Sequence, residues 1–166
     1  MQQNILNKEP IMGSPNWGES KYWSYKDLRV HFRVTGEESN PPIVLIHGFG
    51  ASSDHWRNNA EIFASEGFRV FGIDLIGFGK SEQNLQSKIK HLENQFWANQ
   101  LASFLDEVVD IQKNGKVILI GNSLGALTAI TTLSNRPELI KTIIAAPLPE
   151  PVFVNPIKFS FPNWLL

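Results

Sequence analysis

The sequence has no cysteine, almost no net charge and no long apolar run. Without cysteine, the chain cannot form disulfides, thiolate metal sites or a cysteine nucleophile. The 15 Lys and Arg residues nearly balance the 16 Asp and Glu residues, so no basic face favours nucleic acid or an acidic membrane. No stretch approaches the roughly 18 apolar residues of a membrane span, and residues 1–10 do not resemble a secretory signal. We therefore expect a soluble, cytoplasmic protein.

The chain is long enough for about one domain with a real core, since it has 166 residues. We expect residues 1–20 to be a flexible arm, because prolines and glycines lie among polar residues there. Residues 21–146 are the expected core. Residues 147–166 are dense in proline and apolar residues without a period, which excludes a regular helix. The composition of residues 147–166 indicates a segment that packs beneath structure that this chain does not contain.

The apolar pattern predicts an α/β fold. Strands and helices alternate from residue 43 onward, which indicates a mostly parallel sheet with helices on both faces. Before them, an alternating pattern predicts an antiparallel pair with one wet face. The predicted strands are 22–26, 28–34, 43–46, 69–74, 117–120 and 139–145, and the predicted helices are 54–66, 91–113 and 124–135. Asp54 is the expected N-cap of the first helix, and Gly67 and Gly115 the expected stops of the first two.

The most informative motif is the segment Gly121-Asn122-Ser123-Leu124-Gly125, which follows a buried strand and precedes an apolar helix. This strand-turn-helix context is typical of a nucleophile elbow, in which a tight turn holds a serine in a strained, exposed position. The two glycines leave room where a Cβ would clash. We expect Ser123 to be a catalytic nucleophile. The alternative is a glycine-rich turn with an incidental serine.

A second motif, His47-Gly48-Phe49-Gly50, ends the buried strand at residues 43–46. Acyl transfer needs two backbone N–H groups fixed in place to stabilise the oxyanion. We expect these donors to be the N–H groups of Phe49 and Leu124, with the glycines Gly48 and Gly50 letting the loop turn inward. His47 is a tempting catalytic base, but its place before the loop favours a structural role in bonding nearby backbone.

The third motif is the loop at residues 74–81, which begins with Asp74 and holds two glycines. It lacks the third glycine and the following helix of a dinucleotide fingerprint, so we expect it to shape the floor of the site, with Asp74 in structural hydrogen bonds. Binding of a sugar or phosphate is the alternative. The other histidines, His31, His55 and His91, show no metal-ligand spacing. We expect no metal and no cofactor.

Together these three motifs resemble the α/β-hydrolase fold family over about residues 22–150. The wording of residues 71–81, of the Gly-Asn-Ser-Leu-Gly elbow and of residues 145–150 is most similar to the pheophytinase-like branch of photosynthetic organisms. Carbon–carbon bond hydrolases of the meta-cleavage type also use a Gly-Asn-Ser elbow. The resemblance disfavours relatives with an aspartate nucleophile, the haloalkane dehalogenases and epoxide hydrolases, because the elbow here holds serine.

The family resemblance implies a triad in the order serine, acid, histidine. Of the family's eight strands the chain supplies about six, so the strands that deliver the usual acid and the histidine are absent, and residues 147–166 resemble the start of a truncated cap. Glu150 lies at a position that provides the acid in some relatives. No histidine follows Ser123, and a serine without a base is a poor nucleophile.

Two hypotheses follow from these features. The first is a serine hydrolase acting on a small-molecule ester or related acyl bond, here in a truncated form with little activity alone. The second is a non-catalytic half-domain that binds a partner protein through an exposed sheet edge and the apolar tail, or that receives the acid and histidine from that partner.

Overall fold

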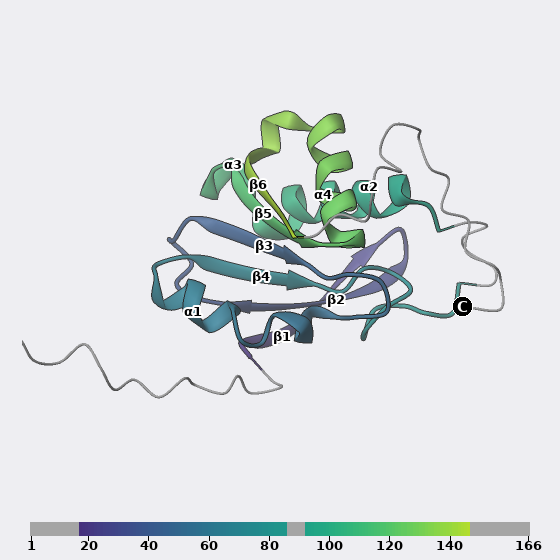
Figure 1. Cartoon of the computed structure of the whole chain (residues 1–166), viewed down its shortest axis with the longest axis horizontal. Helices are drawn as coiled ribbons and strands as arrows, with labels where there is room; N and C mark the ends of the chain where they lie inside the picture. The colour runs from purple at the N-terminus through teal and green to yellow at the C-terminus, as the bar shows by residue number, and fades with distance from the viewer. Residues whose placement is uncertain (1–16, 86–91, 147–166) are drawn as a thin grey trace, which may run out of the picture.

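The computed structural model describes residues 17–85 and 92–146, which form one mixed six-stranded sheet with helices on both faces (Figure 1). The strand order is β1-β2-β4-β3-β5-β6. The strands are β1 (Glu19–Tyr25), β2 (Leu28–Thr35), β3 (Pro42–Ile46), β4 (Arg69–Ile73), β5 (Val117–Asn122) and β6 (Ile140–Ala146). The helical elements are η1 (Ser53–Trp56), α1 (Ala60–Ser65), α2 (Asn94–Phe104), η2 (Leu105–Val109), α3 (Ile111–Asn114), α4 (Leu124–Asn135) and η3 (Pro137–Leu139).

The sheet is antiparallel at its N-terminal side and parallel elsewhere, as the sequence predicts. Strands β1 and β2 form a hairpin, and β2 pairs antiparallel with β4. Strands β4, β3, β5 and β6 then run parallel to their neighbours. The hairpin turns at Lys26 and Asp27, both with positive φ, which is the backbone twist that favours a two-residue connection.

Alternate residues of the central strands face two separate cores. On one face, Val44 and Phe71 join a large cluster with the apolar sides of α2 and α4. On the other face, Ile43 and Val70 pack with residues of η1 and α1. Figure 1 shows α1 on one side of the sheet and α2 and α4 on the other. The three-layer α/β/α arrangement follows from strands that are apolar on both faces.

The single helix predicted for residues 54–66 is wrong, because the segment forms η1 and α1 with a break between them. Ser52, not Asp54, caps the first turn by accepting a hydrogen bond from the Asp54 N–H. The Asp54 carboxylate instead accepts a hydrogen bond from the Arg33 side chain at 2.9 Å. A tertiary ion pair therefore replaces the local capping role.

The long helix predicted for residues 91–113 is also interrupted. It begins at Asn94, widens into a π-turn at η2 and breaks at Asp110, whose φ is +54°. A short α3 follows and ends at Gly115. Periodicity alone does not reveal a left-handed residue within a helical stretch.

Residues 17–20, which the sequence pattern assigns to a flexible arm, belong to the described fold. Trp17 is buried, and its Nε1 donates a hydrogen bond to the Ser53 carbonyl at 3.0 Å. Strand β1 already begins at Glu19. Residues 1–16, the predicted tail at 147–166 and Glu150 lie outside the described residues. Within the described ranges, no helix has the length and apolarity needed to cross a membrane.

Candidate functional site

The loop at residues 47–50 and the elbow at residues 121–125 lie side by side because β3 and β5 are neighbouring strands. Ile46 at the end of β3 pairs with Gly121 near the end of β5, and the chains leave the sheet at the same edge. A Cβ added to Gly48 would lie 3.5 Å from the Ser123 Cβ. The structure thus brings Gly48 and Ser123 into contact across two motifs that lie about 75 residues apart in the sequence.

The backbone of Ser123 has a conformation that non-glycine residues rarely adopt, with φ +50° and ψ −110°. Gly121 and Gly125 allow this turn. A Cβ on Gly121 would lie 2.5 Å from the Ala126 nitrogen, and a Cβ on Gly125 would lie 2.2 Å from the Ile46 carbonyl oxygen. Strain of this kind is kept only where the surrounding structure enforces it.

Ser123 is half-buried at the junction of β5 and α4. Its N–H donates to the Ala146 carbonyl at 3.1 Å, and its carbonyl accepts the Leu127 N–H at 3.1 Å. These bonds fix the backbone between β6 and the first turn of α4. The neighbouring Asn122 is half-buried and Leu124 is buried.

His47 is fully buried, and backbone groups occupy both of its ring nitrogens. Its Nδ1 donates to the Gly48 carbonyl at 2.7 Å, and its Nε2 accepts the Leu75 N–H at 3.0 Å. Burial lowers the pKa of the His47 imidazole, which keeps the ring neutral. With no free nitrogen, His47 cannot accept a proton from Ser123 in this arrangement.

The described residues bring no histidine into hydrogen-bond contact with the Ser123 hydroxyl. His55 lies on the exposed side of η1, with its ring 5.1 Å from that of Trp56. His31 bonds the Asp74 carboxylate and the Ser20 hydroxyl. His91 lies outside the described residues. A histidine base for Ser123 is thus missing from the described part of the chain.

Phe49 and Phe78 form an apolar rim beside the loop. Their rings are 5.3 Å apart in an edge-to-face arrangement, and Phe78 continues the contact to the buried Trp97. Phe49 is 45% exposed although it is a large aromatic residue. An exposed aromatic residue directly after Gly48 gives this edge of the loop an apolar surface.

Asp74 anchors the predicted floor of the site. Its two carboxylate oxygens accept the Ser53 N–H at 2.6 Å, the Lys80 N–H at 2.8 Å and His31 Nδ1 at 2.8 Å. Burial by itself raises the pKa of this carboxyl, but these hydrogen bonds outweigh it and lower the pKa to about 2. Asp74 is therefore ionised, and its structural role matches the role inferred from the sequence.

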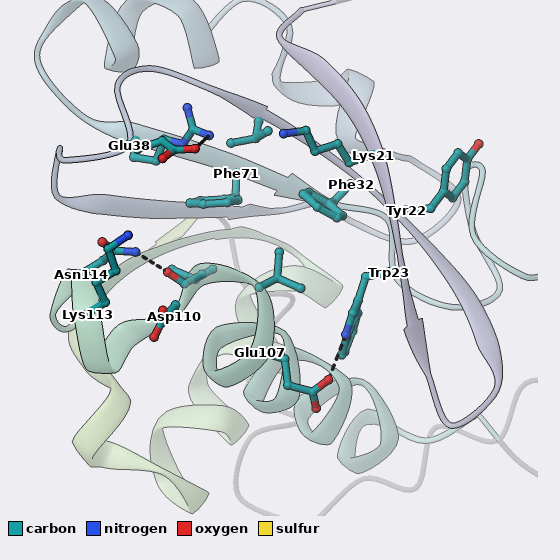
Figure 2. A pocket seen from close by; sticks show the side chains of 14 residues that line it. Lys21, Tyr22, Trp23, Phe32, Glu38, Phe71, Glu107, Asp110, Lys113 and Asn114 are labelled. Carbon is teal, nitrogen blue, oxygen red and sulfur yellow. Dashed lines mark hydrogen bonds and ion pairs between the residues drawn. The ribbon is translucent and has the colours of Figure 1, made fainter.

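A hollow of about 430 Å³ lies elsewhere, between the β1–β2–β4 side of the sheet and the η2–α3 segment. Figure 2 shows the aromatic side chains of Trp23, Phe32 and Phe71 along its wall and the indole of Trp23 bonded to Glu107. None of its lining residues belongs to the three sequence motifs. Periodicity could not reveal it, since its walls come from segments distant in the sequence.

The described residues contain no group of three His, Asp or Glu side chains arranged to hold a metal ion. The carboxylate of Asp74 is fully engaged with His31 and two backbone N–H groups.

Residues 41–165 match the family model described as the alpha/beta hydrolase fold. The chain is 29% identical to mouse epoxide hydrolase 4 over 147 residues, which is 87% of this chain and 39% of that protein. It is 32% identical to a 2-hydroxy-6-oxononadienedioate/2-hydroxy-6-oxononatrienedioate hydrolase of Burkholderia vietnamiensis over 121 residues, which is 71% of this chain and 39% of that protein.

Among solved structures, the thioesterase domain from the curacin biosynthetic pathway superposes with a TM-score of 0.70 at 27% identity, covering 82% of this chain and 48% of that one. The chain spans about two fifths of the length of the curated relatives it matches. The sequence likeness and the shared sheet thus agree over the part of the fold that holds Ser123.

Proposed function

The chain belongs to the alpha/beta hydrolase fold family, and from this premise we propose that it is a serine hydrolase with Ser123 as its nucleophile. The bond attacked is an ester or related acyl bond of a small molecule. The strongest support is the backbone conformation of Ser123, which has φ +50°. The flanking residues Gly121 and Gly125 have no room for a Cβ. A turn of this kind exposes the hydroxyl of a serine at the top of the sheet.

The proposed oxyanion hole consists of the N–H groups of Phe49 and Leu124. Leu124 begins α4, so its N–H lies among the unpaired donors of a helix N-terminus. Phe49 follows Gly48, which lies against Ser123. Two donors fixed before the reaction would stabilise the developing negative charge, an effect worth about 10²- to 10³-fold per donor.

The elbow residue separates this chain from part of its relatives. Matched proteins include epoxide hydrolases as well as a dienedioate hydrolase and a thioesterase domain, and the serine at position 123 favours acyl chemistry over an aspartate mechanism. A finer placement in the pheophytinase-like branch rests on the wording of residues 71–81 and remains part of the proposal.

We propose further that this length of chain has little hydrolytic activity by itself. Its histidine nitrogens at positions 31 and 47 are already bonded elsewhere, and no histidine follows Ser123. Loss of the histidine base from a serine triad costs roughly 10⁶-fold in kcat. The remaining capacity would come from the oxyanion hole and substrate binding.

Fluorophosphonate labelling followed by peptide mapping tests this function. The expected result is a slow adduct on the peptide that contains Ser123, absent from Ser123→Ala and retained by Ser134→Ala, an exposed serine on α4. Circular dichroism of each variant verifies that the chain is folded. A folded protein that never forms an adduct at Ser123 would contradict the proposal.

A second candidate, a half-domain that binds a partner protein, is favoured by the β6 edge. This strand pairs with β5 alone in the described sheet, and Ile144 on it is 52% exposed. An apolar edge strand offers unpaired backbone groups to another strand. In this case hydrolysis would appear only when a partner chain supplies the acid and the histidine, which co-purification with activity measurement would detect.

A further inference from the structure

A second serine, far from Ser123 in the sequence, ends a hydrogen-bonded chain of a hydroxyl, an imidazole and a carboxylate. The Ser20 Oγ lies 2.8 Å from His31 Nε2, and His31 Nδ1 lies 2.8 Å from an oxygen of Asp74. The three residues come from β1, β2 and the loop after β4. No sequence motif links them, since they are brought together by the pairing of β1 with β2 and of β2 with β4.

The directions of these hydrogen bonds follow from the carboxylate. Asp74 is ionised and accepts bonds from the Ser53 and Lys80 N–H groups. It must also accept from His31, so a ring that carries a single proton carries it on Nδ1. The lone pair of Nε2 is then directed at Ser20, whose hydroxyl donates to it. This is the order of groups that activates a serine in hydrolases.

Burial distinguishes the three members. His31 and Asp74 are each 1% exposed, whereas Ser20 is on the exposed face of β1. The base and its carboxylate are therefore shielded from water, and the nucleophile is open to reagents. When His31 gains a proton it forms an ion pair with Asp74 inside the protein, so that no uncompensated charge is created.

Surrounding contacts hold the ring in place. The Tyr22 ring packs against the His31 ring at 5.2 Å. The backbone N–H of His31 donates to the Ser81 hydroxyl at 2.9 Å, and that hydroxyl donates to the backbone carbonyl of Asp74 at 2.7 Å. Tyr22 and Ser81, which contact the His31 ring and its backbone, also border a surface hollow of about 390 Å³.

We propose that Ser20 is a second activated serine, which activated acyl or phosphonyl esters modify covalently and independently of Ser123. In the step, Ser20 Oγ bonds to the electrophilic carbon or phosphorus while His31 Nε2 takes the hydroxyl proton. The bond to the leaving group then breaks, and the leaving group departs with that proton. The products are an O-acyl or O-phosphonyl Ser20, the free leaving group and a neutral His31.

The chain offers a matched control in Ser24. Ser20 and Ser24 lie on the same face of β1 and are both exposed, but it is Ser20 whose hydroxyl bonds an imidazole. We would treat Ser123→Ala protein with a fluorophosphonate and map the modified peptides, so that reaction at the proposed hydrolase nucleophile does not interfere. Adding Ser20→Ala should abolish the adduct, and adding Ser24→Ala should leave it unchanged.

A thiol readout tests the base directly. Because the natural sequence has no cysteine, Ser20→Cys and Ser24→Cys each introduce one thiol into the protein. At neutral pH, iodoacetamide should alkylate the Ser20→Cys variant at least about tenfold faster, since a neighbouring imidazole withdraws the thiol proton. Absence of a Ser20-dependent adduct, or equal alkylation rates in the two cysteine variants, overturns the proposal. Neither result depends on whether Ser123 reacts.

Discussion

Single residues define the candidate site through sterics and buried charge. Ser123 holds a strained backbone that depends on the absence of side chains at Gly121 and Gly125. Asp74 is a carboxylate removed from water and stabilised by donors that point at both of its oxygens. The strained Ser123 backbone and the buried Asp74 carboxylate are each unfavourable by themselves, and contacts with neighbouring residues stabilise them.

Gly125→Ala should destabilise the fold and distort the elbow. The new Cβ would lie 2.2 Å from the Ile46 carbonyl oxygen and 2.7 Å from that of His47. Backbone atoms of two elements must then move apart, which costs about 1–3 kcal/mol or more. Urea denaturation would measure the loss, with Ser134→Ala on the exposed side of α4 as the control. Unchanged stability in Gly125→Ala would mean that β3 and α4 are not in this close contact.

Asp74 should make the free energy of unfolding fall as the pH is lowered into the acid range. Its pKa is lowered from 3.8 to about 2, so the ionised carboxylate stabilises the folded state above about pH 4, and this stabilisation is lost as the pH falls toward about 2. The full effect is about 2 kcal/mol. Asp74→Asn removes the titrating group.

The measurement compares the free energy of unfolding of the natural protein and Asp74→Asn in urea at two acid pH values. The difference in free energy of unfolding between the natural protein and Asp74→Asn should decrease by about 1 kcal/mol from about pH 5 to about pH 3. A gap that stays constant over this range would show that Asp74 does not titrate differently in the folded and unfolded states.

At the scale of elements, the structure divides two helices that periodicity predicts as continuous. The first is split because Asp54 pairs with Arg33 and Ser52 caps η1. The second is split at Asp110, where a left-handed residue ends η2 and begins α3. Strand boundaries are predicted more closely, since a sheet interior requires an unbroken apolar run.

Asp110 offers a clean test of this helix break. Its φ of +54° is costly for residues with a Cβ and least costly for glycine. Asp110→Ala should lower the free energy of unfolding by about 1 kcal/mol, whereas Asp110→Gly should keep or slightly raise it. The difference between these two variants in urea denaturation isolates the backbone conformation. Equal effects of the two substitutions would indicate that Asp110 does not hold a positive φ in solution.

At the scale of the whole molecule, the described sheet is covered unevenly. Helices α2 and α4 cover one face, and η1 and α1 cover part of the other (Figure 1). Strand β6 lies at one edge with Ile144 exposed beside the buried Ile120. An exposed apolar residue on an edge strand favours association with another chain.

Ile144→Lys should reduce concentration-dependent association. A charge on the edge strand disfavours pairing with another strand, while Ile144 contributes little to the core because it is 52% exposed. Ile130→Lys, at a 37% exposed position on α4, is the matched control. Light scattering coupled to size exclusion should show less association for Ile144→Lys alone. An unchanged mass distribution would place any self-association elsewhere.

The sequence by itself determined the order of elements and the location of the loops. Runs such as residues 43–46 and 117–120 identify buried strands because both of their faces are apolar, and the Gly-x-Ser-x-Gly turn lies entirely within one local segment. Local patterns suffice where the deciding interactions are between residues close in the chain.

Only the tertiary structure decided which distant groups meet. The bond from the Leu75 N–H to His47 Nε2, the ion pair of Asp54 with Arg33 and the Ser20–His31–Asp74 chain all join residues of separate elements. The sequence pattern gives His31 no partner, yet the structure places it between a hydroxyl and a carboxylate. The physical reason is that a hydrogen bond depends on position to within a fraction of an ångström, and sequence spacing does not set that position for residues on separate elements.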